Sequence, residues 1–266
     1  MTPLLNNEIF QRIAGPLLVG VLLVCGWEAF CAAKDLPPYI FPAPSDIWQS
    51  FTAHAGSLFA ALASTLRVTL IAFVAATIVG IALAVLFTSS RVLEISLFPY
   101  AVLMQVTPIA AISPLIIILV KETQTALVLC AALVALFPII SNTTLGLRSV
   151  DRGLVNLFRA NGASRWQTLV RLKIPAALPH VFGGLRISIG LALIGAVVGE
   201  FVAGTGGRSA GLAYQILLAG FELDIPLMFA ALMMITFTGV LLFMLMVGLS
   251  RLVLGDWHES ETAPAG

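Results

Sequence analysis

The chain has 266 residues, of which 59% are hydrophobic and only 10% are charged, and its net charge is +1. Soluble domains carry about 25% charged residues and about 45–50% apolar ones. Because this chain cannot cover a water-facing surface, its composition excludes a soluble protein and predicts an all-α integral membrane protein. Its three cysteines lie in apolar segments without metal-ligand spacing, so we expect them to be buried small hydrophobic residues.

Several stretches have the length and apolarity of a transmembrane helix, which needs about 20 mostly apolar residues. We expect six spans, at 13–33, 64–88, 95–120, 124–146, 180–203 and 226–250. The first resembles a signal peptide, but it is long enough to span and no small-x-small cleavage site follows a short apolar core. The four prolines of the segment 34–63 predict that no regular helix begins there before Asp46.

The distribution of charge predicts the orientation of the chain. Seven of its fourteen basic residues lie between residues 147 and 186, where Asp151 is the single acid. Because Lys and Arg are enriched in cytoplasmic loops, this segment is predicted to be cytoplasmic. Counting spans then places both chain termini in the cytoplasm and the loops 34–63, 121–123 and 204–225 on the outer side.

The third span is interrupted by Pro99, Pro108 and Pro114, with polar side chains between them. Each interior proline removes a helical hydrogen bond, and irregular backbone at membrane depth occurs where it is buried in protein or lines a wet cavity. Two interpretations remain open: a kinked packing helix, or a segment that lines a translocation path. The candidate path residues on this and later spans are Gln105, Thr107, Pro108, Ser113, Asn142 and Glu200.

The fifth span places the acidic side chain of Glu200 at membrane depth, where a charge costs a few kcal/mol unless it is paired, protonated or hydrated. The same span has small residues at Gly195 and Gly199, whose spacing permits close helix packing. We therefore expect this span to be central. Glu200 contacts cargo, or it hydrogen-bonds a neighbouring helix, and the second role is favoured.

The basic segment between the fourth and fifth spans is predicted to form two short helices joined by a turn. Asp151 is a good N-cap for the first helix, and Gly162 can adopt a positive φ and end it. The residues 164–167, Ser-Arg-Trp-Gln, form a capping box that begins the second helix. Pro175 and Pro179 are expected to end that helix and to begin the fifth span.

Such a pair of helices has more than one interpretation. A passive amphipathic hairpin that lies on lipid headgroups remains possible. A DNA-binding helix-turn-helix is a poor alternative, because a unit held between two membrane spans can hardly reach DNA, so no nucleic acid partner is expected. Two capped helices at a fixed angle are more specified than lipid contact requires, which favours a contact with another protein.

The run from Gly162 to Trp166, followed by KIPAALP, resembles the EAA loop of ABC importer permeases. The resemblance covers nearly the whole chain and extends to the nitrate/sulfonate/taurine-type branch, which includes permeases for pyrimidine precursors of thiamine and for riboflavin. The segments that carry this wider resemblance are PAPSDIW, TPIAAISPLI, GLRISIGLALIGAVVGEF and GLAYQI.

The resemblance implies a type I ABC importer permease fold with six transmembrane helices and a cytoplasmic coupling helix. It implies an N-terminal span and external loop at 1–63, a five-helix core at 64–254 with the coupling loop at 147–179, and a cytoplasmic tail at 255–266. One departure is that Asn156 stands where the motif has its acid. The implied ATPase-coupling residues are Asn156, Leu157, Phe158, Arg159, Gly162, Ala163, Ser164, Arg165 and Trp166.

The resemblance also implies the partners: a cytoplasmic ATPase subunit, an extracytoplasmic substrate-binding protein, a second copy of this chain in a homodimer, and the lipid of the bacterial inner membrane. This sequence has no G-x-x-x-x-G-K-[ST] run and no catalytic constellation, so we expect no enzymatic activity and no cofactor on it, with ATP on the partner subunit.

The rival class is a stand-alone, ion-coupled secondary transporter that uses Glu200. The substrate stays open between an anion, such as a sulfonate or nitrate, and a neutral heterocycle, such as a pyrimidine precursor or riboflavin. The absence of Lys and Arg deep in the spans leans toward the neutral ligand.

Overall fold

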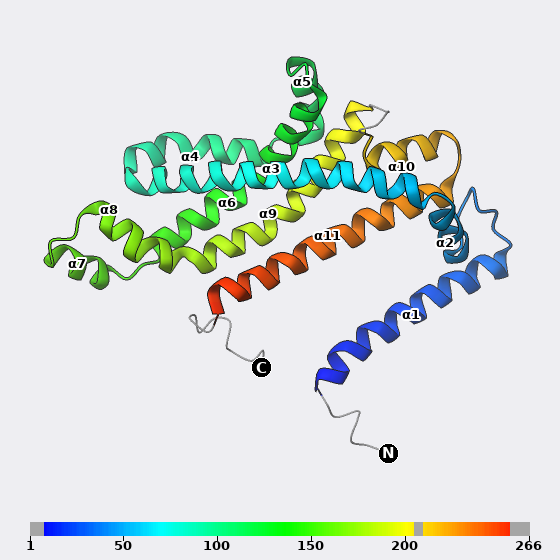
Figure 1. Cartoon of the computed structure of the whole chain (residues 1–266), viewed down its shortest axis with the longest axis horizontal. Helices are drawn as coiled ribbons and strands as arrows, with labels where there is room; N and C mark the ends of the chain where they lie inside the picture. The colour runs from blue at the N-terminus through cyan, green and yellow to red at the C-terminus, as the bar shows by residue number, and fades with distance from the viewer. Residues whose placement is uncertain (1–7, 205–209, 256–266) are drawn as a thin grey trace. The chain divides into compact units, whose positions relative to one another are not determined.

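The computed structural model describes residues 8–204 and 210–255, and all regular structure in these residues is helical (Figure 1). The helices are α1 (Glu8–Lys34), α2 (Pro44–Ala53), α3 (Ala55–Ser89), α4 (Arg91–Val106), α5 (Ile109–Leu119), α6 (Thr123–Arg148), α7 (Arg152–Ala160), α8 (Arg165–Thr168), a π-helix (Leu169–Lys173), α9 (Ile174–Ala203), α10 (Leu212–Phe221) and α11 (Ile225–Leu254).

The helices long and apolar enough to cross a membrane confirm the six predicted spans. Among the described residues, five single helices qualify, and the bent pair α4–α5, when it is counted as one span, makes the sixth. The second span is longer than predicted, because α3 begins at Ala55 rather than at residue 64. The outer loop predicted at 204–225 contains a further short apolar helix, α10.

The chain divides into two compact units. The first comprises the described residues up to Ala60 together with Gln215–Met234, and the second comprises Ala61–Tyr214 and the residues from Ile235 onward. The boundaries inferred from the sequence, at residues 63 and 254, stay a prediction.

In the first unit, α2 is tied to α1 by polar contacts. Ser45 donates from its backbone N–H and its hydroxyl to the Glu28 carboxylate, at 3.1 and 2.7 Å. The prediction that no helix begins before Asp46 was wrong, because α2 begins at Pro44. A proline is tolerated in the first turn of a helix, where its missing N–H has no helical partner to lose.

The cysteines follow their expected burial only in part. Cys31 and Cys130 are buried, but Cys25 is exposed. The reason is its helix: the apolar window of α1 is almost entirely exposed in the single chain.

In the second unit, α6 and α9 form the most extensive helix pair. A Cβ at Gly195 would lie 2.7 Å from the Cα of Ala131, and one at Gly199 would lie 3.0 Å from the Leu127 side chain. The small residues predicted for close packing therefore lie at this interface, as expected. Ser188 of α9 adds a buried bond, donating its hydroxyl to the Ala135 carbonyl at 2.7 Å.

The chain from α8 to α9 is continuous, so the prediction that Pro175 and Pro179 end one helix and begin the next was wrong. The turn before Pro175 widens into the π-helix, in which the Ile174 N–H donates to the Leu169 carbonyl. Pro175 comes directly after this wide turn, at the second position of α9. The second helix of the predicted hairpin, α8, and the fifth span, α9, are therefore parts of one continuous helix.

The third span is broken as its prolines suggested. The axes of α4 and α5 meet at 101°, and the break falls at Thr107 and Pro108 (Figure 1). Pro99 and Pro114 lie inside the two half-helices without breaking them.

Candidate coupling and translocation sites

The turn between α7 and α8 has the local structure predicted for it. The Asp151 carboxylate accepts from the N–H groups of Gly153 and Leu154, at 2.7 and 3.1 Å. Gly162 has φ +74° and follows the end of α7. The Ser164 hydroxyl accepts from the Gln167 N–H at 3.1 Å, and the Gln167 side chain accepts from the Ser164 N–H at 2.8 Å. Both caps and the capping box are confirmed.

This hairpin, defined as residues 151–168, turns apolar side chains outward. Leu157 is 56% exposed and Trp166 is 70% exposed. No residue of α7 is buried. A helix that presents its apolar stripe away from its own protein presents a surface for something else to cover.

The candidate coupling residues cluster on the hairpin but do not all share one surface. Arg159, Ala163, Arg165 and Trp166 line a hollow of about 630 Å³. Asn156 lines an adjoining pocket of about 360 Å³, which Arg159 also borders. The remaining four lie around the helix and the turn: Leu157 faces outward, Phe158 is half-buried, Gly162 is at the tip and Ser164 caps α8.

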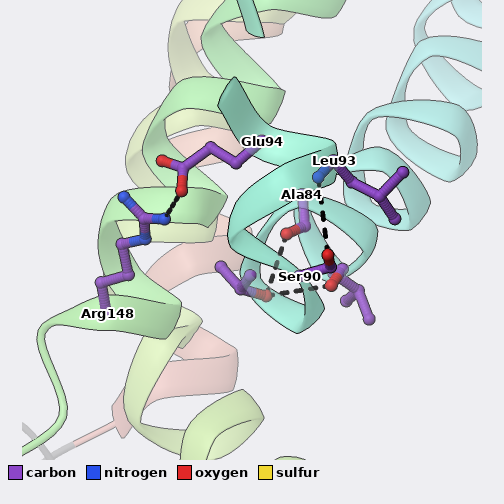
Figure 2. A network of polar contacts seen from close by, with 7 residues as sticks. Ala84, Ser90, Leu93, Glu94 and Arg148 are labelled. Carbon is purple, nitrogen blue, oxygen red and sulfur yellow. Dashed lines mark hydrogen bonds and ion pairs between the residues drawn. The ribbon is translucent and has the colours of Figure 1, made fainter. Parts of the chain in front are cut away.

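An ion pair joins the base of the hairpin to the broken third span. Arg148, in the last turn of α6, donates to the carboxylate of Glu94 in the first turn of α4 (Figure 2). Glu94 itself is held at the start of α4, which Ser90 caps by accepting from the Leu93 N–H (Figure 2).

The far end of α4 borders a pocket of about 380 Å³ at the break of the third span. Three of the candidate path residues line it, Gln105, Thr107 and Pro108. Its other lining residues are apolar and come from α4, α5, α6 and α9, so it has an amide and a hydroxyl but no charged side chain.

The structure does not bring the other candidate path residues to this pocket. Ser113 is buried and its hydroxyl donates to the Ala110 carbonyl of its own helix at 3.4 Å. Asn142 is half-buried, and its amide donates to the Pro138 carbonyl at 2.9 Å. Their contact with a solute stays a prediction.

Glu200 lies at a polar junction between α9, α3 and the start of α10. It is 4% exposed, and its Oε2 accepts from the Thr65 hydroxyl at 3.1 Å and from the Ala213 N–H at 3.2 Å. The Thr65 hydroxyl in turn accepts from the Leu212 N–H at 2.9 Å. Oε1 has no hydrogen-bond partner among the described residues. These contacts support the packing role over a cargo contact.

Gly211 makes room for this junction. A Cβ there would overlap the Glu200 carboxyl group, so no larger residue fits without moving it. Thr65 did not stand out in the sequence, since a threonine in an apolar span is ordinary, and Gly211 entered it only as the first residue of the resembling segment GLAYQI. Only the acid at membrane depth signalled the site. Among the described residues, no group of His, Cys, Asp and Glu could hold a metal ion.

Comparison of the chain with known proteins identifies its family. Residues 76–255 match the family described as the binding-protein-dependent transport system inner membrane component. The riboflavin transport system permease protein RibX of Chloroflexus aurantiacus is 36% identical over 90% of this chain and 88% of its own length. The formylaminopyrimidine transport permease protein ThiX of Halalkalibacterium halodurans is 31% identical over 92% and 96%.

A solved structure has the same fold. The crystal structure of an amino acid ABC transporter with histidines aligns at a TM-score of 0.62, covering 77% of this chain and 96% of that one at 18% identity. The chain belongs to the family of binding-protein-dependent transport system inner membrane components, and it has the ABC importer permease fold. Its relatives are transport permeases rather than enzymes.

Proposed function

We propose that this chain is the membrane-spanning subunit of an ABC importer, in which it forms the translocation path for a small solute delivered by an external binding protein. A separate cytoplasmic ATPase subunit supplies the energy, and two copies of the chain form the homodimer around the path. The observation that carries the proposal is the doubly capped hairpin, whose exposed Leu157 and Trp166 await a partner surface.

The hairpin is built to transmit motion. At one end it follows α6 with only a short linker, and at the other it continues through the π-helix into α9 without a break. The Arg148–Glu94 ion pair links the same base to α4, whose far end borders the pocket at Gln105 and Thr107. A displacement of the hairpin by ATP binding elsewhere would therefore reach the pocket through packed helices.

The proposed placement has the hairpin and both termini in the cytoplasm and the chain in the bacterial inner membrane. The concentration of basic residues between 147 and 186 supports this orientation. We also propose the division into a first span with its loop (1–63), a core (64–254) and a tail (255–266), of which residues 1–7, 205–209 and 256–266 lie outside the described residues.

The proposed substrate class is an uncharged, ring-containing solute rather than an inorganic anion. The pocket at the third-span break has no cationic side chain with which to hold an anion. The relatives named for riboflavin and formylaminopyrimidine support the same class. Uptake of labelled riboflavin and aminopyrimidines, measured beside nitrate and taurine in the same cells, tests it.

The decisive experiment is purification of the tagged chain from its native membrane, followed by identification of proteins present in stoichiometric amount. A co-purifying ATPase supports the importer, whereas a chain that emerges alone in several detergents favours the secondary transporter. Uptake by the Glu200→Gln variant also distinguishes an importer subunit from a secondary transporter. The amide retains an acceptor for Thr65 and Ala213, so an importer keeps its uptake, while an ion-coupled carrier loses it.

A further inference from the structure

The polar residues of α7 line a pocket at the surface. Arg152, Asn156 and Arg159 recur at helical spacing and line the pocket of about 360 Å³ together with Val155, and their own side chains are exposed. The pocket therefore has a polar, solvent-accessible wall on α7.

The rest of that pocket supplies more positive charge. Lys173 of the π-helix and Arg148 of α6 join the two arginines of α7, and no acidic residue lines it. Arg148 is paired with Glu94, which leaves Arg152, Arg159 and Lys173 without a carboxylate partner among the described residues. Cations that share a pocket repel one another, and an anion bound between them removes this repulsion.

The hydrogen-bonding groups and the position of the pocket indicate the kind of anion. Beside the cations it has the Asn156 amide, whose NH2 group can donate to phosphate oxygens, whereas the Thr88 hydroxyl already donates to the Ala84 and Val85 carbonyls, at 3.0 Å each. Thr88 and Leu147 lie next to the ends of α3 and α6, two helices long and apolar enough to cross a membrane. If these ends mark the membrane surface, a ligand in the pocket lies at the level of the lipid headgroups.

We propose that this pocket, lined by Thr88, Arg148, Arg152, Asn156, Arg159 and Lys173, binds a phosphate group, and that its source is the headgroup of an anionic phospholipid. In the orientation proposed above, the pocket faces the leaflet that carries anionic lipid, toward which basic clusters beside spanning helices are attracted. The lipid would hold the hairpin against the ends of α3 and α6, leaving the exposed Leu157 and Trp166 free for a partner protein.

The test uses the full chain in a neutral detergent, titrated with short-chain phosphatidylglycerol, short-chain phosphatidylcholine and inorganic phosphate, with binding followed by thermophoresis. The test variant is Arg152→Gln with Lys173→Gln, and the matched control is Arg171→Gln, a cation of the same π-helix that does not line the pocket. Lys173→Arg serves as the charge-preserving variant.

We expect wild type, Arg171→Gln and Lys173→Arg to bind phosphatidylglycerol in preference to phosphatidylcholine. The double variant should lose about 10- to 30-fold in affinity for phosphatidylglycerol, since two cations near the surface are removed. A melting temperature within a few degrees of wild type shows that the variant is folded.

Three results would overturn the proposal. The first is equal phosphatidylglycerol affinity in the double variant and Arg171→Gln. The second is binding of inorganic phosphate with no preference for phosphatidylglycerol, which makes the ligand a soluble phosphate. The third is loss of a co-purifying ATPase from the double variant with unchanged phosphatidylglycerol affinity, which places these cations at a protein contact. The first two results leave the importer proposal untouched, and the third supports it.

Discussion

Replacing Gly211 with alanine tests the junction around Glu200 more directly than replacing the acid itself. The added methyl group would overlap the carboxyl group of Glu200, so one of the two must move. The Glu200 carboxyl group can move, and its movement would lengthen two hydrogen bonds. Its Oε2 accepts these bonds from Thr65 and Ala213, at 3.1 and 3.2 Å. The start of α10 would then lose its hydrogen bonds to this junction of α3 and α9.

The expected cost follows from these contacts. Each hydrogen bond lost at a buried group costs about 1 kcal/mol, and overpacking adds about 1–3 kcal/mol. The free energy of unfolding should therefore fall by about 3 kcal/mol, which corresponds to a melting temperature lower by about 6–12 °C. Gly220→Ala is the matched control, since Gly220 also lies in or beside α10 and a Cβ there meets nothing within 4 Å.

The assay is thermal loss of the monodisperse size-exclusion peak in detergent, measured on four proteins: wild type, Gly211→Ala, Glu200→Ala and the double variant. In the Glu200→Ala background the methyl group has no carboxyl group to displace, so its cost should fall below about 1 kcal/mol, a coupling of about 2 kcal/mol. The reasoning is refuted if Gly211→Ala and Gly220→Ala have the same melting temperature. It is also refuted if Gly211→Ala lowers the free energy of unfolding by the same amount in the wild-type and Glu200→Ala backgrounds.

Three further predictions concern the hairpin and the helix core. Gly162→Val should abolish uptake with membrane insertion intact, because a backbone φ of +74° costs a β-branched residue more than about 1–2 kcal/mol. Gly162→Asn and the neighbouring Ala160→Val should retain uptake. Normal uptake by Gly162→Val would count against the coupling role. Arg165→Glu should lower the amount of ATPase that co-purifies without lowering the melting temperature, and full stoichiometry would exclude Arg165 from the contact. Gly195→Val should lower the melting temperature by several degrees, because its side chain meets the Ala131 backbone, whereas Gly190→Val on the open side of α9 should melt near wild type.

The local chemistry of the hairpin was predictable because it depends on residues a few positions apart. Asp151, Gly162 and the capping box at Ser164 act within one turn of backbone, and the structure has each in its expected role. The six spans were predictable for the same kind of reason, since a run of about 20 apolar residues needs no knowledge of its neighbours. The helix end predicted at Pro175 was wrong, because the π-helix before Pro175 keeps the helix from α8 to α9 continuous.

The sequence alone therefore determined that the chain lies in a membrane, where its spans are, which residues cap the hairpin helices, and which family it resembles. The tertiary structure decided which side chains meet: that Glu200 binds Thr65 and the start of α10, and that Gly211 is required beside it. It also decided that Arg152 and Arg159 of α7 share a pocket with Arg148 and Lys173, while Leu157 and Trp166 are exposed. These pairings join residues far apart in the chain, and periodicity within one helix cannot say which face another helix will cover.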